Sequence, residues 1–179
     1  MATTKLWTVE EVERLPDENV RYALIKGALY RMPPPMGRHG LVANTIGRVI
    51  GNVVAERNLG AVYNQSGFIL DRDPDVLLEP DIAFVQRSRV PANPDAYPML
   101  APDLVVEVAS PSQTGPSIEE KVSLYLAAGV RLVWEVDPVR RTVRVRRPDG
   151  SDRLLFERDE LDGEDVLPGF RLPVAELFA

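Results

Sequence analysis

The longest helix-like pattern of the chain lies between Arg38 and Asn58. Apolar residues recur there at the 3.6-residue spacing of a helix with one buried face. They are Leu41, Val42, Ile46, Val49, Ile50, Val53 and Val54. Gly60 stands where a glycine commonly terminates a helix, so the pattern predicts a helix over residues 38–58.

Two shorter helices are predicted, one on each side of the long one. Thr8 and Glu11 have the spacing of a capping box, which predicts a short helix that Pro16 ends. The second covers about residues 117–128 and ends at Gly129, since its apolar residues also follow the helical period.

Strand-like runs fill most of the remaining chain. Residues 22–32 indicate two short strands around a turn at Lys26-Gly27. Apolar runs predict further strands at 61–65, 67–70, 76–85, 103–110, 131–137 and 142–148. A last helical turn is predicted at 174–178. This order predicts an α/β fold with a central mixed β-sheet flanked by helices, in one domain of residues 1–179.

Two of the strand-like runs carry a carboxylate where an apolar residue is expected. Asp81 lies in LLEPDIAFV (77–85), directly after Pro80, and Glu107 lies in APDLVVEVASPS (101–112). A lone ionised carboxylate in such a run is costly unless it is paired or bound to a metal. The pattern therefore marks Asp81 and Glu107 as candidate functional residues.

The helix predicted at 117–128 adds a cation near these acids. Lys121 falls on or beside its apolar face, three residues after Ile118 and four before Tyr125. Two acids and a lysine can hold Mg²⁺ and activate water, since Mg²⁺ prefers one or two carboxylates plus water and phosphate oxygens. A buried ion pair between Lys121 and one acid explains the same pattern equally well, so both interpretations stay open.

The amino-acid composition indicates a globular protein and excludes some classes of site. The chain has 179 residues, of which 45% are hydrophobic and 27% charged, as in globular proteins. The absence of cysteine excludes a disulfide framework and a zinc–thiolate site, and it fits a reducing cytoplasm. The sequence has no signal peptide and no apolar run of about 20 residues, so we expect a cytoplasmic protein that does not span a membrane.

The net charge of −6 argues mildly against nucleic acid as a partner, because phosphate binding depends largely on Lys and Arg. A bound metal ion or a local basic site can offset that charge. Five arginines cluster at Arg140, Arg141, Arg144, Arg146 and Arg147. The alternation of arginine and valine there favours a strand with one solvated face over a nucleic-acid surface.

Several segments, taken in order, resemble the Uma-type family of restriction endonucleases, a bacterial branch of the PD-(D/E)XK nuclease superfamily. They are RMPPPMGRHG, EPDIAFV, APDLVVEVASPS, EKVSLYLAAGVRLVWEVDP, TVRVRRPDG and EDVLPGFRLPVAELF. The likeness extends from about Tyr22 to Phe178. It implies the restriction-endonuclease-like fold and Mg²⁺-dependent hydrolysis of phosphodiester bonds in DNA, with Mn²⁺ as a substitute ion.

The resemblance also assigns roles to single residues. The Pro-Asp motif of the family maps onto Pro80-Asp81, and its second acid maps onto Glu107. Ala109 stands where the superfamily motif has its lysine, and Lys121 in the following helix takes that position. The resemblance implies Asp81, Glu107 and Lys121 as catalytic residues. It implies Asp81, Glu107 and the carbonyl of Val108 as metal ligands.

The chain departs from the family pattern where further acids are common. Family members often read like YELIDGE where this chain reads YALIKGA, which has Ala23, Lys26 and Ala28 instead. Ser117 stands where the family often places an acid four residues before the lysine. This loss of negative charge indicates either weaker metal binding or an alternative function. The alternative is a catalytically inactive nuclease-fold module that binds nucleic acid or protein.

Three further expectations concern contacts. His39, the sole histidine, matches a family position that can contact substrate, although a local hydrogen bond is the favoured interpretation. Trp134 and Tyr125 are expected in the core rather than against nucleic-acid bases. A nuclease that cuts both strands of DNA often works as a symmetric pair, so we expect a homodimer.

Overall fold

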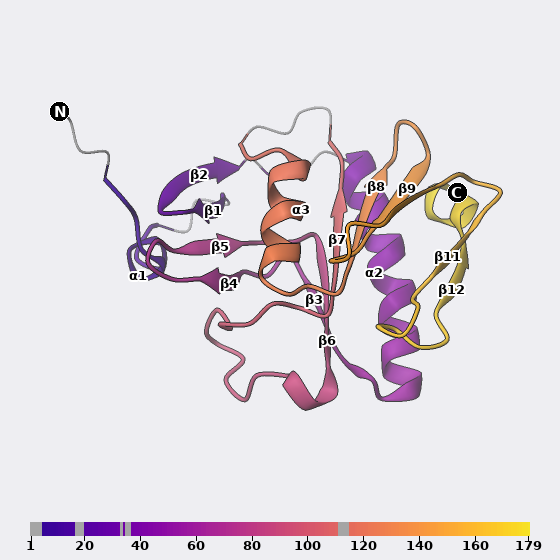
Figure 1. Cartoon of the computed structure of the whole chain (residues 1–179), viewed down its shortest axis with the longest axis horizontal. Coiled ribbons are helices and arrows are strands. Elements are labelled where there is room, and N and C mark those ends of the chain that lie inside the picture. The colour runs from indigo at the N-terminus through magenta and orange to yellow at the C-terminus, as the bar shows by residue number, and fades with distance from the viewer. Residues whose placement is uncertain (1–4, 17–19, 33, 35–36, 111–114) are drawn as a thin grey trace.

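A six-stranded sheet forms the centre of the molecule (Figure 1). The computed structural model describes residues 5–16, 20–32, 34, 37–110 and 115–179. In order across the sheet, the strands are β10 (Asp152–Leu155), β9 (Thr142–Arg146), β8 (Leu132–Asp137), β7 (Leu104–Val108), β6 (Ile82–Gln86) and β3 (Gly60–Asn64). Strands β7 and β8 run parallel and the other neighbours antiparallel, which confirms the predicted mixed sheet.

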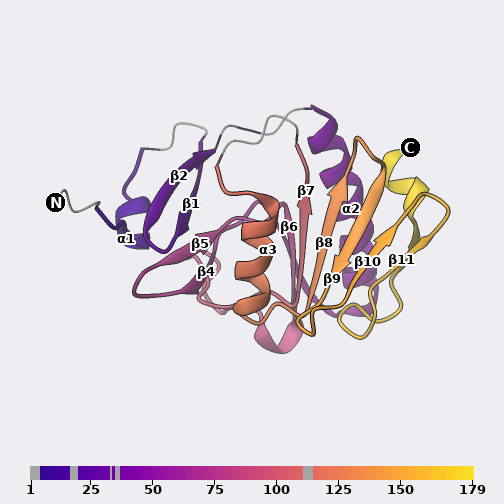
Figure 2. The same ribbon diagram turned by 45° about the horizontal axis from the view of Figure 1, so that its top comes forward.

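Helix α3 (Ile118–Ala127) connects the parallel strands β7 and β8 and covers one face of the sheet (Figure 2). Its N-terminus is capped by Ser117, whose hydroxyl accepts a hydrogen bond of 3.1 Å from the N–H of Glu120. Gly129 follows the helix at a φ of 100°, which glycine adopts without a steric penalty. Successive side chains of β7 alternate between faces, so Val105 and Glu107 point toward α3.

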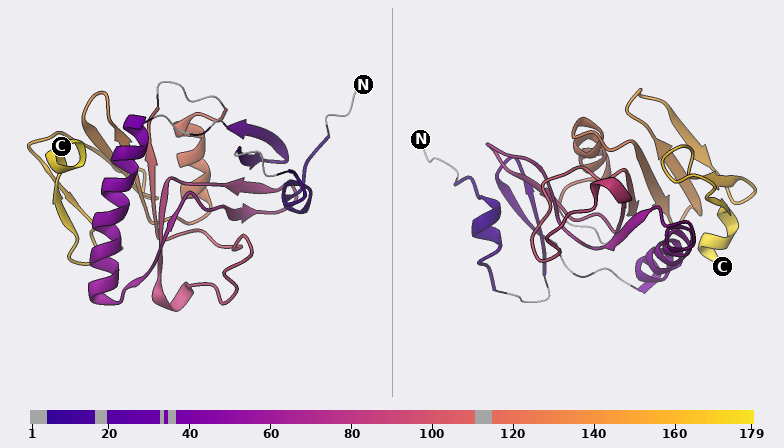
Figure 3. Two further views of the ribbon diagram at one scale, coloured as in Figure 1. Left: turned by 180° about the vertical axis from the view of Figure 1, so that it is seen from behind. Right: turned by 90° about the horizontal axis from the view of Figure 1, so that it is seen from below.

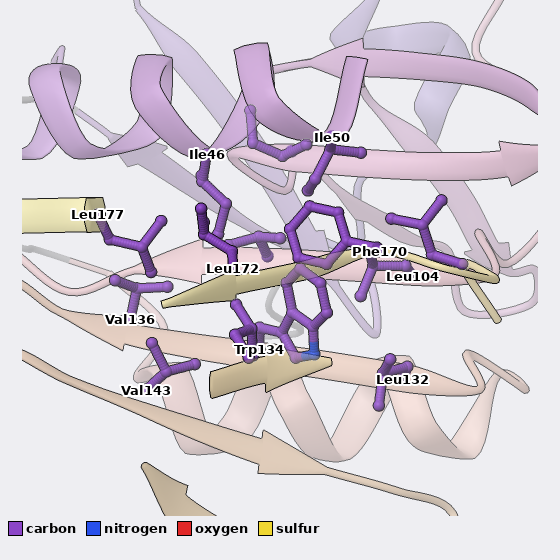
Figure 4. Close-up of a cluster of buried hydrophobic side chains, with 14 of the residues drawn as sticks. Ile46, Ile50, Leu104, Leu132, Trp134, Val136, Val143, Phe170, Leu172 and Leu177 are labelled. Carbon is purple, nitrogen blue, oxygen red and sulfur yellow. The ribbon is translucent and has the colours of Figure 1, made fainter. Parts of the chain in front are cut away.

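Helix α2 (Gly37–Arg57) covers the opposite face (Figure 3) and confirms the helix predicted at 38–58. Ile46 and Ile50 are fully buried in the core between α2 and the sheet, where the rings of Trp134 and Phe170 lie 5.3 Å apart (Figure 4). The prediction was wrong for Leu41, which is 72% exposed. The buried face passes through residues 42, 46 and 50, and Leu41 lies on its flank.

A second sheet of four strands lies beside the central sheet and combines the N-terminal hairpin with two later strands. Its strands, in order, are β2 (Ala28–Met32), β1 (Arg21–Ile25), β5 (Val76–Leu78) and β4 (Phe68–Asp71). Lys26 and Gly27 form the turn between β1 and β2 with φ values of 50° and 77°, which confirms the predicted hairpin. Helix α1 (Val9–Val12) starts at the predicted capping box, and its first N–H donates to the carboxylate of Asp75 at 2.8 Å.

The strand predicted at 76–85 is two strands, β5 and β6, which belong to different sheets. Pro80 lies between them and has no N–H for a sheet ladder, which is the physical reason for the interruption. Glu79 and Asp81 therefore lie at the junction of the two sheets, and both are buried.

The C-terminal segment completes the core on the α2 side. It contains β11 (Glu160–Asp162), β12 (Arg171–Pro173) and the 3₁₀ helix η2 (Val174–Phe178), which matches the helical turn predicted there. Strands β10, β11 and β12 were not predicted, because strands this short with exposed charged positions give little alternation. A second 3₁₀ helix, η1 (Arg87–Arg89), opens the proline-rich loop 87–102. None of the helices in the described ranges has the length and apolar character of a membrane span.

Candidate active site

Strand β7 ends at one end of the central sheet, near the start of helix α2 (Figure 2). Asp81 lies there, beside Val108 at the end of β7. Its Oδ2 accepts a hydrogen bond of 2.8 Å from the N–H of Val108 and lies 3.0 Å from Nε2 of His39. Burial raises the pKa of this carboxyl, but the hydrogen bonds with His39 and Val108 and the positive charge of Lys121 lower it further than burial raises it. The net shift of the pKa is downward, so Asp81 is ionised at neutral pH.

Glu107 lies on β7 and is almost completely buried. Its Oε2 is 2.9 Å from Nζ of Lys121, and its Oε1 accepts a hydrogen bond of 2.7 Å from the hydroxyl of Tyr125. Burial raises the pKa of this carboxyl; the charge of Lys121 opposes that rise, and the negative charge of Asp81 adds to it. Asp81 and Glu107 therefore lie close enough to repel each other.

Helix α3 supplies both partners of Glu107. Lys121 and Tyr125 are four residues apart, so they lie on the same face of the helix and reach the same carboxylate. Lys121 is only 5% exposed. The structure thus brings together the three residues that the sequence singled out. Tyr125 lies in the core as predicted, and its contribution of a hydroxyl to the site was missed, although the four-residue spacing is visible in the sequence.

Glu79 and Arg21 also belong to this site and were missed by the sequence analysis. Nη1 of Arg21 lies 3.5 Å from Oδ1 of Asp81, and the charge of Arg21 acts on Glu79 as well. Burial raises the pKa of Glu79 from 4.5 to about 7, against the opposing charges of Arg21 and Lys121. The signal was present in LLEPD, where Glu79 is an acid in the same apolar run as Asp81.

The raised pKa of Glu79 predicts a pH-dependent loss of stability. A carboxyl that titrates at about 4.5 when unfolded and at about 7 when folded loses stability as the pH rises through that window. The full effect is about 3 kcal/mol at most. We expect Glu79→Gln to remove it, so that the variant gains stability relative to wild type between about pH 4 and pH 8. Urea unfolding at both pH values measures this, and parallel pH profiles for the two proteins would contradict the assignment.

Two surface grooves reach the site, one lined by Asp81 and the other by Glu79. A groove of about 410 Å³, here called the amide groove, lies between α2 and the end of β3. Its lining includes Asn44, Arg48, Asn64, Gln65 and Asp81. A groove of about 750 Å³, here called the tyrosine groove, is lined by Tyr63, Gln65, Glu79 and Tyr97 among others. Asp81 and Glu79 thus face separate grooves, with Pro80 between them.

The carboxylates fit a Mg²⁺ site with few protein ligands. Oδ1 of Asp81 has only the 3.5 Å contact to Arg21 within the described ranges, and each oxygen of Glu107 accepts one hydrogen bond and keeps a free lone pair. No three His, Asp, Glu or Cys side chains among the described residues form a ready-made metal cage. Mg²⁺ suits such a site, because it binds through one or two carboxylates and keeps several waters.

The four departures from the family pattern occupy different environments. Ala23 is fully buried in the cluster that contains Tyr125, so this position lies near the residues that surround Glu107. Lys26 and Ala28 lie exposed at the hairpin turn, and Ser117 caps helix α3. Lys26 and Ala28 therefore lie outside the buried cluster, whereas Ala23 lies inside it.

The arginine cluster at 140–147 is matched by acids. Arg144 pairs with Asp152, and Arg146 pairs with both Glu119 and Glu135. The remaining pairs are Arg140 with Asp137, Arg141 with Glu157 and Arg147 with Glu164. The favoured interpretation as a solvated strand face agrees with this arrangement, since the charges of these arginines are locally balanced.

Comparisons with known proteins agree with the fold. A crystal structure from Anabaena variabilis, described as a putative nuclease, has a TM-score of 0.84 and 24% identity, over 96% of this chain and 97% of that one. No match was found among curated proteins. A family model described as "Putative restriction endonuclease" matches residues 9–175. Because this match covers nearly the whole chain, the chain belongs to the Uma2 family, as the resemblance predicted.

Proposed function

We propose that the protein is a divalent-metal-dependent endonuclease that hydrolyses phosphodiester bonds in DNA. The observation that carries the proposal is the burial of the carboxylates of Asp81 and Glu107 at the end of β7, with Asp81 bonded to the N–H of Val108 and Glu107 to the buried Lys121. A bound divalent cation would offset the negative charges of these two carboxylates. Membership of a family described as restriction endonucleases supports the same function.

Asp81, Glu107 and the carbonyl of Val108 are the proposed ligands of Mg²⁺ or Mn²⁺. The metal supplies a Lewis acid for the phosphoryl oxygen and lowers the pKa of a bound water. His39 and the N–H of Val108 hold Oδ2 of Asp81, which leaves Oδ1 as the oxygen for the metal. Lys121 stands beside Glu107, where its ammonium group orients the attacking water or neutralises charge that develops on the phosphate.

Calorimetric titration with Mn²⁺ and Mg²⁺ tests the metal site directly. We expect wild type to bind these divalent ions at one class of site. Asp81→Asn and Glu107→Gln should each lower the affinity for the ion at least about tenfold. Both substitutions keep the size of the side chain and remove its charge. Arg144→Gln is a matched control outside the site. Unchanged metal affinity in both variants, or no binding by wild type at millimolar ion, would overturn the metal site.

A second candidate function is a module on the same fold that binds nucleic acid or protein without cleavage. The observation that favours it is the closed arrangement of Glu107, which is bonded to both Lys121 and Tyr125. Such an ion pair is sufficient to satisfy a buried carboxylate without a metal. Thermal unfolding distinguishes the two functions, because an ion that binds the native state must raise the melting temperature. The metal-dependent nuclease predicts this rise, and the module without a metal site predicts none.

A further inference from the structure

The amide groove and the tyrosine groove share Gln65, the residue after strand β3. Its backbone N–H donates to the carbonyl of Asp81 at 3.1 Å, and its φ of 47° turns the chain at this point. Alternation along β3 places Asn64 and Tyr63 on opposite faces of the sheet, so each lines one groove. The grooves therefore lie on the two sides of the end of β3, and Gln65 forms a wall of both.

The lining of the tyrosine groove excludes phosphate and suits a nucleobase. Glu13, Glu79 and Asp95 line it, and its described lining residues include no Lys or Arg. The carboxylates of Glu13 and Asp95 would repel a phosphate, whereas the N–H groups of a neutral base can donate to the carboxyl oxygens of the groove. The half-buried rings of Tyr63 and Tyr97 line the groove, Tyr63 packs edge-to-face with Phe68, and an aromatic ring can stack on every base.

Tyr97 is held in place by a glycine. A Cβ atom at Gly67 would lie 2.7 Å from the ring of Tyr97, so the absence of a side chain lets the ring pack against the backbone. The outer part of Tyr97 stays half-exposed at the groove. Tyr97 also packs against the buried cluster that contains Val9 and Leu77, so its ring has little conformational entropy left to lose when a base stacks on it.

The amide groove has the opposite character. Arg48 supplies a positive charge, and the exposed side chains of Asn44 and Asn64 supply amide donors and acceptors. Groups of these types make most contacts of proteins with phosphate and sugar. Since Asp81 lines the same groove, a backbone lying there passes the proposed metal site.

The geometry points to a subsite for one unpaired nucleobase in the tyrosine groove, next to the phosphate that is cut. This inference rests on the proposed function and names its substrate: a single-stranded DNA segment, or a nucleotide turned out of a duplex. A base in a duplex cannot enter, because its faces are covered by stacking and its edge by pairing. Tyr97 stacks on the base, and Gln65 contacts the strand where it passes from one groove to the other.

Binding of a DNA strand that carries one 2-aminopurine base tests the subsite, because stacking quenches its fluorescence. The assay uses wild type, Tyr97→Leu and Tyr97→Phe in the presence of Ca²⁺, so that no cleavage is required. We expect quenching with wild type and Tyr97→Phe, and about tenfold weaker binding with Tyr97→Leu. An unpaired strand should bind more tightly than the same sequence as a duplex.

A second variant covers the case in which Tyr97→Leu is unstable. Gln65 is exposed, so Gln65→Glu leaves packing intact, and its added charge should weaken single-strand binding about threefold. Equal binding by wild type, Tyr97→Leu and Gln65→Glu, or tighter binding of duplex without quenching of its 2-aminopurine, would overturn the subsite. Such a result would leave the proposed nuclease standing if metal binding still depended on Asp81. Loss of the metal site with intact base quenching would overturn the nuclease instead.

Discussion

Replacement of Lys121 by methionine is expected to lower the free energy of unfolding by about 3 to 5 kcal/mol at neutral pH. Nζ of Lys121 lies 2.9 Å from Glu107, and both side chains are at most 6% exposed. Without Lys121, the one partner that the Glu107 carboxylate keeps among the described residues is the hydroxyl of Tyr125, and it faces the negative charge of Asp81. Urea unfolding of wild type and Lys121→Met measures the loss.

The loss should depend on pH in a defined direction. The pKa of Glu107 is already raised, mainly by burial, and removal of Lys121 raises it further. A carboxyl with a raised folded pKa loses stability as the pH rises above its unfolded value, so Lys121→Met should be closest to wild type at low pH. The double variant Lys121→Met with Glu107→Gln removes the uncompensated charge and should recover most of the loss. Unchanged stability of Lys121→Met at every pH would contradict a buried ion pair.

The second large effect concerns cleavage. Asp81→Asn is expected to reduce the rate of DNA cleavage by at least about 10²-fold, because the uncharged amide is a poor metal ligand in place of the carboxylate. The carbonyl oxygen of asparagine can still accept the hydrogen bond from Val108, so the fold should be retained. Cleavage of a labelled DNA fragment in Mg²⁺ and in Mn²⁺ measures the rate.

The chain contains a matched control for this substitution. Asp103 also follows a proline and is also buried, but its carboxylate is bonded to Arg89 and to the N–H of Gln86. Asp103→Asn should therefore lower stability and leave the cleavage rate of the folded protein unchanged. A similar loss of rate in both variants would mean that the effect of Asp81→Asn is structural.

The sequence predicted most of the fold, because its strongest signals come from burial. The long helix, the hairpin and strands β7 and β8 follow their apolar periods closely. The interruption at Pro80 was less clear, since the apolar residues continue on both sides of it. Which sheet each half joins depends on contacts between strands β1 and β5, which local pattern does not encode.

Only part of the candidate site could be predicted, namely the charged residues that lie at positions expected to be buried. Glu107 and Lys121 are charges at positions that the pattern marks as buried, so their pairing could be anticipated. Arg21 and Glu79 reach the site from the second sheet and from the junction of the two sheets. Their roles depend on how the two sheets meet, and no spacing along the chain carries that information.

The contribution of the C-terminal segment to the core has a consequence for biosynthesis. Phe170, Leu172 and Leu177 pack in the same cluster as Trp134 and the buried residues of α2. A ribosome makes these residues after those other members of the cluster, so the apolar face of the sheet stays uncovered until they have emerged. A truncated product that ends before them would display this apolar surface and be open to chaperones and proteases. The proposed catalytic residues all precede this segment, so they are synthesised before the core can close.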